Sequence, residues 1–379
     1  MFVAVGCSWA SSSTAATRAA APALDRSAAA TAAAIRVDPP GRTFTIVATG
    51  DVLTENAVLV TAADAAVNGT RYDFDSVFGP VTPIITAADL AICHMEIPIG
   101  SPGERAGIYG RSAFGGNLLL APAEVAVGLR DAGYDRCSTA SNHSNDLGLG
   151  GIDSTLARFD EVGISHVGTA RSAAESLPAP IDVAGVRVAH LSYTRYSNTV
   201  QPRDPWRLNF PGTARAVIDD VAAVRAAGAE VVVLSIHVSQ ELLRGPTSVD
   251  RAFVAAITAA GGVDLVIQHG PHVVQPLELV NGTWVYWSVG NFVSAMGQPG
   301  ATRYGPPTLD GLLAWVRFTE TGPGRFEVTP TTVLLCSEIL SRIVRPAVES
   351  AADPGLPSAL RGQMRDCIER SLPLVPDLR

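Results

Sequence analysis

Two hydrophobic patterns alternate along the chain from Thr43 onward. Short runs rich in β-branched residues, typical of buried strands, are separated by longer amphipathic stretches with helical spacing. Such alternation is typical of a layered α/β protein. The predicted strands cover residues 43–49, 90–93, 134–139, 186–193, 231–236, 265–268, 277–280 and 283–289. The predicted helices cover residues 74–88, 122–132, 151–162, 212–228 and 249–261.

Two hairpins and a less regular tail complete the predicted elements. Asn281 and Gly282 separate two apolar runs, which favours a type I′ turn between strands. A second hairpin is expected within residues 312–328, with its turn around Gly322 and Gly324. Residues 337–379 have a weaker pattern, and we interpret them as helices or a tail packed on the outside.

The first 41 residues differ in composition from the rest. Ala4, Val5 and Gly6 before Cys7 resemble the end of a bacterial lipoprotein signal, although the basic region and the apolar run of a full signal are missing. We interpret the start as lying inside a longer reading frame; an ordinary cysteine in a ragged N-terminus is the alternative. Residues 8–34, almost all Ala, Ser and Thr, predict a linker or an Ala-rich helix. We therefore expect an extracytoplasmic protein that contacts a membrane only through an N-terminal lipid anchor.

Composition and cysteine spacing narrow the class of protein. With 379 residues, 47% of them hydrophobic and 17% charged, the chain can bury a large core. A formal net charge of -8 without a basic cluster excludes a dedicated nucleic-acid binder. No close cysteine pair predicts a thiolate metal site. Cys93 and Cys137 are expected to be buried free thiols, whereas Cys336 and Cys367 can form a disulfide outside the cytosol if their geometry permits.

Polar side chains stand where five of the predicted strands end. They are Asp51, His94 with Glu96, Asn142 with His143 and Asp146, His237 with Glu241, and His269 with His272. Because ligands gather at the carboxyl ends of strands in open α/β sheets, we expect these residues to converge. Any one of the histidines alone would favour a structural role, but their joint placement favours a metal site, of the type that holds Mn, Fe or Zn. His166 and His190 keep the structural interpretation.

Six motifs around these residues resemble, in order, those of the CapA family of poly-γ-glutamate capsule synthesis proteins. They are TIVATGDV (45–52), DLAICHMEIPI (89–99), ASNHSNDLGLGGIDST (140–155), SIHVSQE (235–241), DLVIQHGPHVVQPLE (264–278) and YWSVGNFV (286–293). The family fold resembles calcineurin-like metallophosphoesterases. The resemblance implies a multi-layer α-β-β-α sandwich of metallophosphatase type in residues 42–335. A signal and linker in residues 1–41 would precede it, and a C-terminal helical extension in residues 336–379 would follow it.

The resemblance also implies roles for individual residues. The implied ligands of a pair of divalent ions are Asp51, Glu96, Asn142, His237, His272 and, as a further ligand, His269. His143 is the implied catalytic proton donor, and Asp146 and Glu241 orient it or a ligand. Asn291 either lines the site or shapes the turn.

The chain departs from the family motifs at several positions. Ser141 replaces the first Asn of its motif, Val238 and Ser239 replace a Trp-Gly pair, and Gly270 takes a position that often holds His. His94 replaces the usual Asn, so it either supplies an imidazole to the site or points to the other face of its strand.

Three functions remain open from the sequence. The first is a cell-surface component that makes or exports poly-γ-glutamate or a related anionic capsule polymer, with membrane-bound capsule synthesis partners. The second is a metal-dependent hydrolase of phosphoesters or γ-glutamyl amides, and the third is a metal-free scaffold of the same fold. An anionic substrate needs local cations, and five loop arginines are candidates, each with a solvated surface role as the alternative. They are Arg111, Arg195, Arg203, Arg207 and Arg303.

Overall fold

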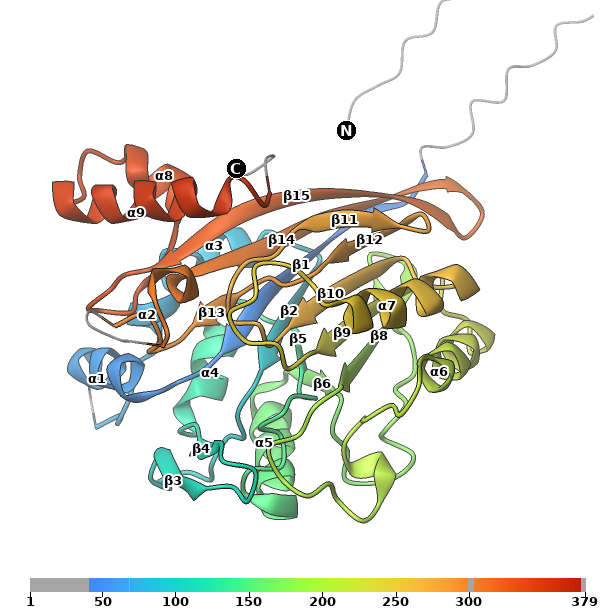
Figure 1. Cartoon of the computed structure of the whole chain (residues 1–379), viewed down its shortest axis with the longest axis horizontal. Coiled ribbons are helices and arrows are strands. Elements are labelled where there is room, and N and C mark those ends of the chain that lie inside the picture. The colour runs from blue at the N-terminus through green and yellow to red at the C-terminus, as the bar shows by residue number, and fades with distance from the viewer. Residues whose placement is uncertain (1–40, 68, 299–302, 376–379) are drawn as a thin grey trace, which may run out of the picture. The chain divides into compact units, whose positions relative to one another are not determined.

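The computed structural model describes residues 41–375 except 68 and 299–302 (Figure 1). The expected signal and linker, including Cys7, lie outside these residues. Across the described ranges, no helix is both long enough and apolar enough to cross a bilayer.

Two sheets form the centre of the described unit (Figure 1). In spatial order, the first sheet contains β16 (Val344–Pro346), β15 (Arg325–Ser337), β14 (Asp310–Gly322), β1 (Thr43–Val52), β2 (Leu90–Met95), β5 (Arg136–Ser138) and β6 (Ser165–Val167), and β13 (Asn291–Val293) also pairs with β1. The second contains β11 (Leu277–Val280), β12 (Thr283–Tyr286), β10 (Leu265–His269), β9 (Val231–His237), β8 (Val186–Thr194) and β7 (Ile181–Val183). A separate hairpin joins β3 (Gly107–Arg111) to β4 (Asn117–Leu120).

Helices cover the outer faces of both sheets. Those of the first sheet are α1 (Asn56–Ala65), α2 (Asp75–Phe78), α3 (Thr82–Ile85), α4 (Glu124–Asp131) and α5 (Gly148–Val162). Those of the second sheet are α6 (Ala214–Ala226) and α7 (Ser248–Ala260). Two short 3-10 helices, η1 (Pro205–Arg207) and η2 (Pro306–Leu309), lie in loops. These layers confirm the predicted α-β-β-α sandwich.

The side chains of β1 show why residues 46–48 in its middle are a continuous apolar run. Phe44 and Ile46 pack into the core between the two sheets, whereas Val47 and Val52 pack against the outer helices. A strand that is buried on both faces has no solvent side to mark with polar residues. Each large aliphatic side chain buried in this way contributes about 1.5–3 kcal/mol.

Most predicted elements are confirmed with shifted ends. The predicted helix 74–88 is two short helices, α2 and α3, because Pro80 lacks the N–H that a continuous helix needs at that point. The predicted strand 134–139 shortens to β5. The predicted strand 283–289 ends at Tyr286, after which the chain leaves the second sheet and pairs with β1 of the first through β13. Both expected hairpins are present, β11 with β12 and β14 with β15.

The cysteine prediction is half wrong. Cys336 and Cys367 form the expected disulfide, with their Cα atoms 6.3 Å apart. Cys93 and Cys137, expected as free thiols, are also joined. They lie opposite each other on the neighbouring strands β2 and β5, a register that the sequence pattern does not reveal.

The C-terminal segment closes one end of the core between the sheets. β15 continues through Cys336 to Ser337, and the chain then forms β16, α8 (Ala347–Ala352) and α9 (Ser358–Ser371). Ala347, Met364 and Cys367 join the core between the sheets. The expected helical extension is therefore packed on the sandwich, and its first residues belong to a strand.

Candidate metal centre

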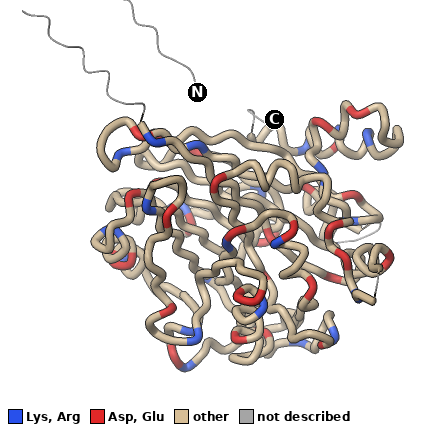
Figure 2. Tube along the Cα trace, turned by 180° about the vertical axis from the view of Figure 1, so that it is seen from behind, with Lys and Arg blue, Asp and Glu red and all other residues tan. Residues whose placement is uncertain are grey.

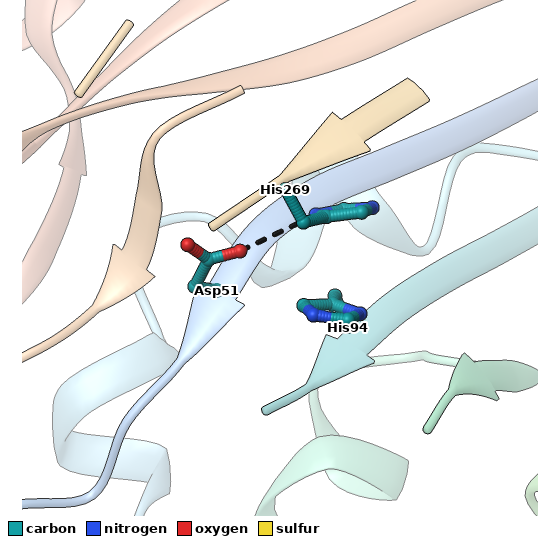
Figure 3. Close-up of side chains that lie close together, drawn as sticks. All are labelled: Asp51, His94 and His269. Carbon is teal, nitrogen blue, oxygen red and sulfur yellow. Dashed lines mark ion pairs between the residues drawn. The ribbon is translucent and has the colours of Figure 1, made fainter. Parts of the chain in front are cut away.

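Four strands from the two sheets bring candidate ligands together at their carboxyl ends. β1 carries Asp51, β2 carries His94, β9 ends at His237 and β10 ends at His269. At these strand ends, two groups of three side chains have their ligand atoms close enough to hold a metal ion; a third group, Asp310 with Cys336 and Cys367, lies elsewhere, and its two thiols are joined in a disulfide. One group is Asp51, His94 and His269 (Figure 3), and the other is Asp51, Glu96 and His272. The structure thus brings together residues that are far apart in the sequence.

Asp51 lies at the centre of both groups. Its Oδ1 is 3.4 Å from His269 Nδ1, and its Oδ2 is 3.1 Å from His272 Nδ1. The backbone N–H of Gly270 also donates to Oδ2, at 3.1 Å. Burial opposes ionisation of Asp51, but the nearby imidazoles of His269 and His272 outweigh it and hold its pKa well below the usual range. Asp51 is therefore a carboxylate at neutral pH.

His94 points into the cluster, which settles the orientation that the sequence left open. Its Nδ1 lies 2.7 Å from Ser138 Oγ and its Nε2 lies 3.0 Å from His237 Nδ1. Its ring stacks on that of His269, with centroids 4.0 Å apart. Burial lowers the pKa of His94 well below its usual value and that of His237 to about 3. Neutral imidazoles keep a lone pair for a metal ion.

Glu96 and His272 form the second side of the cluster. The closest cationic atom to Glu96 is His272 Nε2, 3.7 Å from its Oε1. Burial raises the pKa of Glu96 well above its usual range. Burial disfavours the charged form of His272, but the charges of Glu96 and Asp51 raise its pKa to about 10. Asn291 Oδ1 lies 3.0 Å from His272 Nδ1, so Asn291 lines the site and holds the candidate ligand His272 in place.

Several buried atoms of metal-binding type, in the cluster and in the lining of the pocket above it, have no hydrogen-bond partner among the described residues. They are Asp51 Oδ1, both carboxylate oxygens of Glu96, Asn142 Oδ1 and His269 Nδ1. Leaving such atoms unpaired costs about 1–3 kcal/mol each. Carboxylate, amide and imidazole donors are the ligand types that divalent Mn, Fe and Zn take. The residues present therefore fit a divalent metal ion.

Two glycines allow the ligand-bearing strands to approach closely. A Cβ on Gly50 would lie 2.1 Å from the carbonyl oxygen of Gly290. Gly270 has φ +99°, and its Cβ would lie 2.0 Å from Val238 O and 2.8 Å from His237 Nε2. At both positions any residue larger than glycine would require the backbone to move.

His143 and Asp146 form a hydrogen-bonded pair beside the cluster. His143 Nδ1 lies 2.6 Å from Asp146 Oδ2, as expected for an orienting carboxylate. Leu119 N–H donates to the same oxygen. Burial raises the pKa of Asp146, and the hydrogen bond from His143 partly offsets this effect. Asn198 Nδ2 lies 3.1 Å from His143 Nε2, so a loop after β8 completes this arrangement.

A pocket of about 460 Å³ opens over the cluster. Its lining includes Asn142, His237, Gly270, Glu241 and Arg303. Glu241, predicted to orient His143 or a ligand, accepts hydrogen bonds from Arg303 and Tyr304 instead.

Of the five candidate loop arginines, Arg303 lines this pocket. Arg195 pairs with Asp250, and the buried Arg207 pairs with Asp153. Arg111 and Arg203 are exposed.

Residues 45–296 match the protein family described as Bacterial capsule synthesis protein PGA_cap. The chain belongs to this family. A relative from Bacillus subtilis (strain 168), the PGA biosynthesis protein CapA, is 30% identical over 264 residues, which are 68% of this chain and 65% of that protein. The capsule biosynthesis protein CapA of Bacillus anthracis is 26% identical over 268 residues, 69% of this chain and 62% of that protein. The chain thus spans less than two thirds of the length of either relative.

Among solved structures, the calcineurin-like phosphoesterase YfkN from Bacillus subtilis is similar over 88% of this chain and 99% of that chain. The two share 13% sequence identity, with a TM-score of 0.45.

Within the PGA_cap family motifs, the structure explains two of the departures. His94, in place of the usual Asn, adds an imidazole to the cluster. Ser141, in place of the first Asn, donates its hydroxyl to the carbonyl of Glu96 and accepts from His143 N–H. His166 and His190 lie outside the cluster, bonded to Asp160 and Ser235 as the structural interpretation expects.

Asn198 is a site residue that the sequence reasoning missed. It follows β8, and its backbone N–H donates to the carbonyl of Asn142 while its side chain contacts His143. The signal in the sequence is the run of polar residues, 194–199, that follows the predicted strand 186–193.

Proposed function

We propose that this chain acts in the biosynthesis or export of poly-γ-glutamate or a related anionic capsule polymer, through a site that holds two divalent ions. The observation that carries the proposal is the buried cluster around Asp51, in which metal-type donor atoms converge without protein partners among the described residues. Membership of the PGA_cap family and the names of the Bacillus relatives support the choice of polymer.

The cluster divides naturally into two halves that share Asp51. His94 and His269 would hold one ion, and Glu96 and His272 the other. Asn142 and His237, which line the pocket, stand between the cluster and an incoming substrate. Bound divalent ions would supply positive charge to draw in and polarise an anionic substrate. The chain's own residues supply a rigid, buried frame that fixes the donor atoms.

Metal analysis tests the proposal directly. The full chain, purified with Mn²⁺, Fe²⁺ or Zn²⁺, should hold metal in stoichiometric amount by plasma mass spectrometry. Asp51→Asn should lose both ions because Asp51 belongs to both groups. His166→Gln is the matched control, since this imidazole bonds Asp160 away from the cluster. Wild-type protein that takes up no metal would leave the metal-free scaffold as the better reading.

A hydrolase acting on γ-glutamyl amides or phosphoesters at the same site is the second candidate. The His143–Asp146 pair favours it, because the carboxylate accepts from Nδ1–H and leaves Nε2 as the atom that takes up or releases a proton. His143→Ala should abolish hydrolysis of poly-γ-glutamate or p-nitrophenyl phosphate esters while metal content stays at the wild-type level. Equal turnover by wild type and His143→Ala would remove His143 from the reaction.

We propose further that the protein works outside the cytoplasm, anchored through a lipid on Cys7 and beside membrane-bound capsule synthesis partners. The sequence before Cys7 supports this location, and so do the two disulfides, which persist in oxidising compartments. Cys7→Ser should release the protein from the membrane fraction. Unchanged fractionation would count against the anchor.

A further inference from the structure

Arg303 is held in place at the rim of the pocket. Its Nη2 donates to Glu241 Oε2 at 2.6 Å, and its guanidinium lies over the Tyr304 ring, 5.0 Å from the centroid. The Tyr304 hydroxyl donates to the same Glu241 oxygen at 3.0 Å. Burial and the nearby Glu241 charge raise the pKa of Tyr304 to about 12, so this hydroxyl keeps its proton. A long side chain is thereby fixed in one direction.

The fixed guanidinium keeps donor capacity for a ligand. The side chain of Arg303 is 67% exposed, whereas that of Glu241 is 30% exposed. Among the described residues, Glu241 is its hydrogen-bonding partner, through one of the two terminal nitrogens. Arginine presents five N–H donors in a planar fork that matches a carboxylate. The remaining donors can therefore engage a second carboxylate from solution.

The charge around the pocket makes Arg303 stand out. The other described residues of the lining are neutral or acidic, and they include Asn142, Asn198, His237 and Glu241. Elsewhere, basic and acidic positions are interspersed along the described trace (Figure 2). A polyanion that enters the pocket therefore meets one basic side chain among the described lining residues, that of Arg303. In γ-linked polyglutamate each residue keeps a free α-carboxylate beside its amide bond.

We propose that Arg303 selects the substrate of this site by binding the free α-carboxylate of a γ-glutamyl residue whose amide lies over Asn142 and His237. This role rests on the proposed function in capsule polymer synthesis. Glu241 and Tyr304 act as positioning residues that aim the guanidinium. The pocket is thus specific for chains that carry a carboxylate next to the amide.

Binding of two matched oligomers tests this role. One probe is a fluorescent hexamer of γ-linked glutamate, and the other is the same hexamer with each α-carboxyl converted to a carboxamide. The full chain loaded with Mn²⁺ should bind the acid hexamer about tenfold or more tightly than the carboxamide. Arg303→Ala should abolish this ratio by weakening the acid hexamer alone. Arg303→Lys should recover part of it, because Lys keeps the charge and loses the fork.

Arg317→Ala is the control, since Arg317 is an exposed arginine of β14 that pairs in register with Thr45, near the opposite end of β1 from Asp51. A ratio that persists in Arg303→Ala, or that falls equally in Arg317→Ala, overturns the role of Arg303 and leaves the proposed function standing. Wild-type protein that binds neither hexamer overturns both.

Discussion

Glu96 and Asp310 are both buried carboxylates, and their surroundings differ. Asp310, at the start of β14, accepts hydrogen bonds from Arg370 at 3.0 and 2.6 Å and from Ser371 at 3.3 Å. Glu96 is also buried, yet both of its oxygens lack a hydrogen-bond partner among the described residues. One carboxylate is satisfied by the chain, and the other is not.

The difference separates groups that stabilise the fold from groups that serve a ligand. A buried charge is costly unless it is paired, so Arg370 and Ser371 offset the cost at Asp310. Glu96 has only the more distant His272 beside it and no hydrogen bond, so part of the cost of its burial stays uncompensated unless something from outside the chain binds there. Stability and metal binding should therefore respond to different substitutions.

Breaking the satisfied pair should have the largest effect. Arg370→Ala leaves Asp310 buried without its ion pair, and we expect the free energy of unfolding to fall by about 3–5 kcal/mol. Urea denaturation at pH 7.5 measures this loss. Metal content should not change, because Asp310 and Arg370 lie outside the cluster around Asp51. A loss below about 1 kcal/mol would refute the comparison.

Removing the carboxylate of Glu96 should reduce the stabilisation that a bound metal ion gives to the fold. At about 100 times its Kd, Mn²⁺ should stabilise the wild-type protein by about 3 kcal/mol. Glu96→Gln should lose most of this gain, which thermal unfolding with and without Mn²⁺ would reveal. Glu349→Gln, an exposed glutamate of α8, is the matched control. An equal gain in the Glu96 variant would show that Glu96 does not bind metal.

The pH dependence of stability should reveal the raised pKa of the Asp310 carboxyl. Burial raises its pKa to about 6, although Arg370 partly offsets this effect. Since the folded pKa lies above the ordinary value of 3.8, the contribution to stability is full below about pH 4 and is lost as pH rises through 6. This loss amounts to about 2–3 kcal/mol. Between pH 4 and 6 the free energy of unfolding of the wild type should fall by this amount relative to that of Asp310→Asn. Equal pH dependence of the two proteins would contradict this prediction.

Breaking an exposed ion pair should have the smallest effect on the free energy of unfolding. Arg215 and Asp219 of α6 pair at 2.7 Å, but their side chains are 77% and 54% exposed. Arg215→Ala should leave the free energy of unfolding almost unchanged, because solvent screens this pair. Urea denaturation beside Arg370→Ala checks this, and a loss as large as that of Arg370→Ala would mean that burial does not explain the difference.

Local sequence patterns predicted the layers and the strand ends because each depends on a short window of residues. Apolar runs such as residues 231–236 specify a strand buried on both faces, and the polar residue that follows marks its end. The sequence could not show that β13 leaves its neighbours to pair with β1. That pairing brings Asn291 opposite Asp51, and it depends on contacts between residues 240 positions apart.

The orientation of His94 was undecided for a related reason. Alternate residues of a strand face opposite sides, so which side faces the site depends on the register with the neighbouring strand. In the structure His94 lies opposite Asp51 on β1, and both side chains enter the cluster. The partnership of Cys93 with Cys137 on the next pair of strands depends on register in the same way.

The missing side chain at Gly270 bears on how this chain diverged from its relatives. Gly270 stands where the family motif often has His, and a Cβ there would collide with Val238 O and His237 Nε2. His94, in turn, supplies an imidazole where the motif has Asn. Restoring His at position 270 would therefore require the backbone around Val238 and His237 to move, so this position can no longer return to the family residue by a single substitution.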